Sequence, residues 1–126
     1  MTMKKMTRIF AVLLSVALLL CSFSFATNST ANYRDQTVNY SCTASSTTAT
    51  AETCYPTVGM ERYASISATY RHFINGALDI GYAGNSMSNY SGDASTSCSY
   101  SGAISVVATS SHSVESWSGV LTEYWP

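Results

Sequence analysis

Ten residues near the middle of the chain, Tyr63-Ala64-Ser65-Ile66-Ser67-Ala68-Thr69-Tyr70-Arg71-His72, alternate between apolar and polar side chains. A period of two is typical of a β-strand that has one face in a core and the other in water. The buried face is predicted to carry Ala64, Ile66, Ala68 and Tyr70, and the exposed face Ser65, Ser67, Thr69 and Arg71. The stretch therefore predicts a central strand of a β-sheet.

A second stretch, Ile104-Ser105-Val106-Val107-Ala108-Thr109-Ser110-Ser111-His112, repeats the pattern. When Ala64 is set over Ile104, the two stretches share Ser, Ala, Thr and His at matching places. We expect both to be central strands that lie edge to edge, with Ile66 and Val106 facing a shared interior. The match can also arise by chance between strand-type residues, and a repeat that occurs only twice does not predict a solenoid.

Turn residues separate these stretches from other short strand-like runs. Asn75–Gly76 is a two-residue hairpin signal, and the return strand is predicted over 77–82. The region 84–101 is rich in turn residues, with a short edge strand at 96–100. Further strands are predicted at 36–43, 49–54, 102–114 and 117–125. Evenly spaced short strands predict an all-β fold, a single small β-sandwich of Greek-key-like antiparallel strands, in preference to a Greek-key barrel.

The amino-terminal residues have the pattern of an export signal. Lys4, Lys5 and Arg8 precede an apolar run, and small residues at Ser24 and Ala26 suit a cleavage site after Ala26. We therefore predict a secretory signal peptide at 1–26, a flexible lead at 27–35 and the β-sandwich domain at 36–126. The alternative is an uncleaved membrane anchor, for which the apolar run is short.

Cleavage after Ala26 changes the charge of the chain. The mature protein keeps three arginines, no lysine and all seven acidic residues, which gives a net charge of −4 with neutral histidines. Nucleic-acid binding needs a basic face, so this composition disfavours it, and it likewise disfavours attraction to an anionic membrane or cell wall. No stable membrane insertion is expected after cleavage.

Three cysteines remain after the signal, namely Cys42, Cys54 and Cys98. Export makes a disulfide plausible, and three cysteines always leave one unpaired. We favour a Cys42–Cys54 bridge, because both residues lie in neighbouring strand-like runs joined by a short loop. Cys98 is the competing partner for either, and a leftover thiol is expected to be buried.

Few residues indicate catalysis or metal binding. His72 and His112 have the same place in the two central stretches and would approach if these paired side by side, but two histidines do not complete a zinc site. They are weak metal candidates, and no cofactor is predicted. Serine is abundant, but no Gly-x-Ser-x-Gly motif is present. A Ser–His–Asp group can still assemble from distant positions, which leaves a small secreted hydrolase as a third choice.

Aromatic residues suggest a binding surface near the carboxyl end. Trp117, Tyr124 and Trp125 cluster there in sequence, and exposed rings stack on sugars or fill pockets of a protein partner. The alternative is that Trp117 closes one end of the core. Our first hypothesis is a secreted, extracellular, non-catalytic module that binds or adheres to a protein or glycan ligand.

The chain ends Leu121-Thr122-Glu123-Tyr124-Trp125-Pro126, an aromatic-rich end on a Ser-rich chain. In this ending and in its general character it resembles the lactococcin 972 type of secreted bacteriocin. The resemblance covers only these last residues, and the acidic mature chain differs from such peptides, which are often basic. It implies a second hypothesis, a secreted bacteriocin-like antimicrobial effector, and assigns no functional residue.

Overall fold

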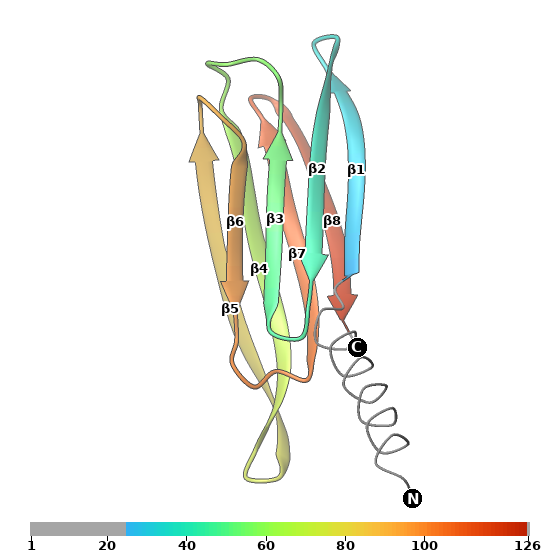
Figure 1. Ribbon diagram of the computed structural model, residues 1–126, viewed down its shortest axis with the longest axis vertical. Coiled ribbons are helices and arrows are strands. Elements are labelled where there is room, and N and C mark those ends of the chain that lie inside the picture. Colours follow the sequence, from blue (N-terminus) through green and yellow to red (C-terminus); the bar gives the residue numbers. More distant parts are fainter. Residues whose placement is uncertain (1–24, 126) are drawn as a thin grey trace, which may run out of the picture.

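The structure is a computed structural model that describes residues 25–125, and this part of the chain consists of eight strands joined by turns and loops (Figure 1). No helix that could cross a membrane is found among these residues. The strands are β1 (Phe25–Tyr33), β2 (Gln36–Ala44), β3 (Thr48–Cys54), β4 (Arg62–Ile74), β5 (Ala77–Asn89), β6 (Ala94–Ser99), β7 (Ser105–Val114) and β8 (Trp117–Trp125).

The strands form two antiparallel sheets of four, with the orders β1-β2-β3-β6 and β5-β4-β7-β8. The chain passes from one sheet to the other after β3, after β5 and again after β6. The two sheets lie face to face in Figure 1, with the core between them. The predicted fold class, a small all-β sandwich, is therefore confirmed.

The two central stretches pair as predicted. β4 lies antiparallel to β7, with Ala68 opposite Ala108. Ile66 is 2% exposed and Val106 is fully buried, so both face the interior. Most other core side chains are alanines, and the bulk comes from Tyr70, whose hydroxyl donates to the carbonyl oxygen of Cys98 at 3.2 Å across the interior.

The β4–β5 hairpin also forms where Asn75–Gly76 predicts it. Both residues have positive φ, 50° and 78°, as a tight two-residue turn requires. The return strand is longer than predicted, since β5 runs on to Asn89 through the turn-rich residues. Pairing with β4 along its full length overrides the weak strand propensity of Gly, Asn and Ser there.

The prediction of a flexible lead at 27–35 is wrong. Phe25–Tyr33 form strand β1, which pairs with β2 along its whole length. The predicted signal peptide, residues 1–26, lies outside the described residues except for Phe25 and Ala26, and the predicted cleavage point falls inside β1.

The predicted Cys42–Cys54 disulfide is also wrong. All three cysteines of residues 25–125 are free thiols. Cys42 lies opposite Ala51 and points into the core, whereas Cys54 lies opposite Asn39 and points to the outer face of the same sheet. A bridge cannot join side chains on opposite faces without moving the backbone.

Candidate ligand-binding face

The outer surface of the β5-β4-β7-β8 sheet is lined mainly by serine and threonine. We call it the hydroxyl face and define it by the side chains that alternate with the buried ones on these strands. None of its members is acidic, and the only charged member is Arg71. Glu61, just before β4, borders the face and accepts a hydrogen bond from Ser88 at 3.4 Å. Its members are Tyr63, Ser65, Ser67, Thr69, Arg71, Phe73, Leu78, Ile80, Tyr82, Gly84, Ser86, Ser88, Ser105, Val107, Thr109, Ser111, Ser113, Ser118, Val120, Thr122 and Tyr124.

The hairpin register explains why apolar side chains reach this face. A two-residue turn at Asn75–Gly76 sets Ile80 opposite Arg71 and Tyr82 opposite Thr69. Because directly opposite residues share a face, the apolar side chains of β5 lie beside the polar side of β4. Leu78, Ile80 and Tyr82 are therefore exposed instead of buried.

One row of this face has an aromatic ring at each edge. The row runs across the sheet through Tyr82, Thr69, Val107 and Tyr124, one residue from each strand. Tyr82 is 75% exposed and Tyr124 is 61% exposed. Three strand spacings separate their backbones by roughly 14 Å. Two accessible rings thus flank a short stretch of hydroxyl and aliphatic surface.

A groove of about 490 Å³ lies beside this row. Its lining includes Thr69, Arg71, Ser105, Val107 and Tyr124. The groove combines an aromatic ring, aliphatic groups, hydroxyls and one cation. Such a mixture of apolar surface and a few polar groups is typical of sites for small or extended ligands.

The predicted binding residues do not form one patch. Trp117 and Trp125 lie at opposite ends of β8 and both point inward, against the core. Trp117 packs edge-on against Tyr40, with 5.0 Å between ring centroids, so it closes one end of the core. Only Tyr124 points fully outward, and Tyr124 and Trp125 contribute to the groove.

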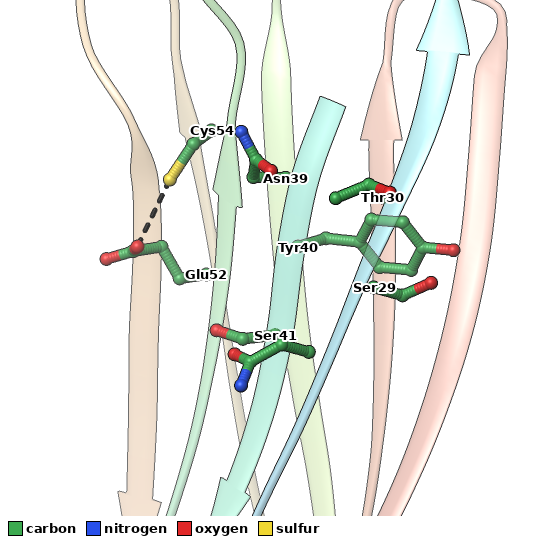
Figure 2. A pocket seen from close by; sticks show the side chains of 8 residues that line it. Ser29, Thr30, Asn39, Tyr40, Ser41, Glu52 and Cys54 are labelled. Atoms are coloured by element: carbon green, nitrogen blue, oxygen red, sulfur yellow. Dashed lines mark hydrogen bonds between the residues drawn. The ribbon is translucent and has the colours of Figure 1, made fainter. Parts of the chain in front are cut away.

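A second depression lies on the outer side of the other sheet. It has a volume of about 470 Å³ and is lined by amides and hydroxyls together with Glu52 and Cys54 (Figure 2). The Cys54 thiol donates to Glu52 Oε1 at 3.1 Å. Partial burial and the carboxylates of Glu52 and Asp93 raise the pKa of Cys54 to about 12. At neutral pH the thiol therefore stays protonated, and a protonated thiol is a poor nucleophile.

The two histidines lie far apart. Because β4 and β7 are antiparallel, His112 lies opposite Ala64, eight residues along β4 from His72. His72 Nε2 is 3.6 Å from Asp79 Oδ2, and its ring stacks on Tyr100. Among residues 25–125, no three His, Cys, Asp or Glu side chains are grouped as metal ligands would be. The proximity expected from their shared register is therefore wrong.

His112 belongs to a buried polar network. Ser110 Oγ lies 2.7 Å from its Nε2, and Thr53 Oγ1 lies 2.8 Å from its Nδ1. The Thr53 hydroxyl donates its single proton to the carbonyl oxygen of Tyr63 at 2.8 Å, so toward His112 it can only accept. The proton of the neutral His112 ring is therefore on Nδ1, and Nε2 accepts the hydrogen bond that the Ser110 hydroxyl donates. Burial lowers the pKa of His112 to about 4. Both Ser110 and His112 are buried, so this Ser–His pair lines no cleft that a substrate could enter.

Comparison of this chain with protein-family models, with curated proteins and with solved structures finds no match.

Proposed function

We propose that this protein is a secreted, non-catalytic β-sandwich that binds a glycan outside the cell through its hydroxyl face. The observation that supports this most is the row with Tyr82 and Tyr124 at its edges and hydroxyls around it. Tyrosine rings stack on the C–H faces of sugars, and serine and threonine exchange hydrogen bonds with sugar hydroxyls. A spacing of roughly 14 Å between the backbones of the two tyrosines suits an oligosaccharide rather than a single sugar.

The absence of acidic residues on this face favours binding over hydrolysis. Glycoside cleavage ordinarily uses two carboxylates, and the hydroxyl face has none. The other groups that could act as nucleophiles are poorly suited. The Ser110–His112 pair is buried, and the raised pKa of Cys54 keeps its thiol protonated.

Secretion remains a hypothesis from the sequence. The basic head, apolar run and small residues of 1–26 support it, and a glycan-binding module would meet its ligands outside the cell. Fractionation of cells that express the full chain would test it. We expect the protein in the medium, shortened at its amino end, and retention of the full-length chain inside the cell would contradict the hypothesis.

Binding can be tested by co-sedimentation with a panel of insoluble polysaccharides and by titration with soluble oligosaccharides. The test variants are Tyr82→Ala and Tyr124→Ala. Tyr90→Ala is the matched control, because Tyr90 is an exposed tyrosine just beyond the end of β5, eight residues along the chain from Tyr82 and outside the row. We expect each test variant to bind about tenfold more weakly, since one stacked ring is worth roughly 0.5–1.5 kcal/mol beyond its buried area. Unchanged binding by both test variants would show that the ligand does not use this face.

A further inference from the structure

We infer that the glycan bound by the hydroxyl face is anionic, and that Arg71 binds its carboxylate or sulfate group. This inference rests on the proposed function and adds the chemical class of the ligand. Arg71 projects from β4 between Ile80 on β5 and Ser105 on β7, next to the row that Tyr82 and Tyr124 flank. It also lines the groove of about 490 Å³.

No acidic side chain of the hydroxyl face is available to neutralise Arg71. The two acidic residues on the edge strands of this sheet point to the other side. Asp79 lies opposite His72 and approaches its ring, and Glu123 accepts a hydrogen bond from Thr27 on the opposite sheet. Within residues 25–125, no acidic side chain forms an ion pair with Arg71. An exposed guanidinium in a groove without a carboxylate partner is suited to an anion from outside the chain.

The other two arginines of residues 25–125 are differently placed. Arg62 is 2% exposed, and its guanidinium donates to the carbonyl oxygens of Tyr55, Thr57, Met60 and Tyr90. Arg34 lies in the β1–β2 turn, at the opposite end of the molecule from the β4–β5 turn, and packs over the Tyr33 ring (Figure 1). Among residues 25–125, Arg71 is therefore the only arginine that is both exposed and close to the aromatic row.

The net charge does not oppose a local anion site. Residues 25–125 hold three arginines and no lysine against seven acidic residues, which gives −4 with neutral histidines. At physiological ionic strength, exposed charges are screened beyond about 8 Å, so distant carboxylates weaken a direct contact little. Thr69 and Ser105 lie beside Arg71 on the same face and can bind the sugar hydroxyls around the acidic group.

The test is a glycan array that holds carboxylated, sulfated and neutral glycans, followed by titration with tetragalacturonate and with its methyl ester. The ester keeps the sugar rings and removes the charge. The variants are Arg71→Gln, which removes the charge, and Arg71→Lys, which keeps the charge but loses the two-pronged hydrogen bonding. Arg34→Gln is the control, because it removes an equal charge from the other end of the molecule.

We expect the wild-type protein to bind the acidic glycans of the array. Comparing its binding to the carboxylated and to the sulfated glycans shows which anionic group it prefers. For an acidic ligand, Arg71→Gln should weaken binding about tenfold to a hundredfold and Arg71→Lys less, while Arg34→Gln binds as wild type. If neutral glycans bind as tightly as acidic ones and Arg71→Gln has no effect, this inference is overturned and the proposed function stands. If the wild type retains no glycan at all, the proposed function fails, and this inference fails with it.

Discussion

The buried histidine makes a quantitative prediction about acid stability. His112 is 1% exposed, and burial lowers its pKa from 6.5 to about 4. As the pH falls below 6.5, the unfolded chain takes up a proton at this residue and the folded chain does not. The contribution of His112 to the free energy of unfolding is therefore fully present above pH 6.5 and is lost progressively as the pH falls toward 4.

The size of the effect follows from the two pKa values. Each unit of difference corresponds to about 1.4 kcal/mol, which gives a loss from His112 of about 2 kcal/mol at pH 5 and about 3 kcal/mol at pH 4. The free energy of unfolding of a small domain is only about 5–15 kcal/mol, so such a loss is a large part of the total.

The assay is urea unfolding followed by tryptophan fluorescence, since Trp117 and Trp125 both pack against the core. Unfolding free energies are measured between pH 7 and pH 4 for the wild type and for His112→Gln, and the two curves are subtracted. The subtraction removes the contribution of groups common to both proteins, including His72. We predict that the wild type loses about 3 kcal/mol more than the variant over this range.

Parallel curves for wild type and variant would refute this reasoning. If His112→Gln does not fold, a side-chain NMR titration of the wild type gives the same information. The His112 ring should remain neutral at pH 5, and a midpoint near 6.5 would mean that the ring is solvated in the folded protein.

Three further predictions concern the fold. Arg62→Met should lower the free energy of unfolding in urea by about 3 kcal/mol or more, because four carbonyl oxygens each lose a hydrogen bond from the guanidinium. The turn variant Arg34→Met should change it by less than about 0.5 kcal/mol. Equal effects would contradict the anchoring role of Arg62. Gly81→Ala should lower the melting temperature and reduce the free energy of unfolding by about 1–3 kcal/mol, because a Cβ there would lie 2.4 Å from the Tyr100 ring. The control Gly92→Ala should have little effect, because the nearest atom to its added Cβ is 3.4 Å away. Alkylation in denaturant without reductant should label Cys42, Cys54 and Cys98, because all three are free thiols. Adding a reductant should leave the melting temperature unchanged. A protein mass that shows a disulfide between two of them would disprove the free-thiol arrangement.

Local signals in the sequence predicted the parts of the fold that depend on local physics. Period-two alternation identified the buried faces of β4 and β7, because a strand must turn every second side chain to the core. Asn75–Gly76 predicted its hairpin, because both residues accept positive φ. Strand β1 was missed, because small and polar residues lie on both of its faces and only pairing with β2 makes it a strand.

The predicted disulfide and the predicted binding patch both failed because their residues lie on opposite faces of the strands. Ala44 pairs with Ala49 across the β2–β3 turn, so Cys42 and Cys54 fall on opposite faces even though the loop between their strands is short. Alternation along β8 likewise separates outward Tyr124 from inward Trp117 and Trp125. Tyr82 could have been found from the sequence, because a two-residue turn at Asn75–Gly76 fixes it opposite Thr69, on the polar face.

Backbone amide NMR with a bound oligosaccharide tests the central claim most directly, because it reports which of the two outer faces meets the ligand. We predict that the largest shift changes follow the row through Thr69, Tyr82, Val107 and Tyr124 and extend to Arg71. Changes centred instead on the depression of the other sheet, around Asn39 and Cys54, would contradict the assignment of the hydroxyl face as the binding surface.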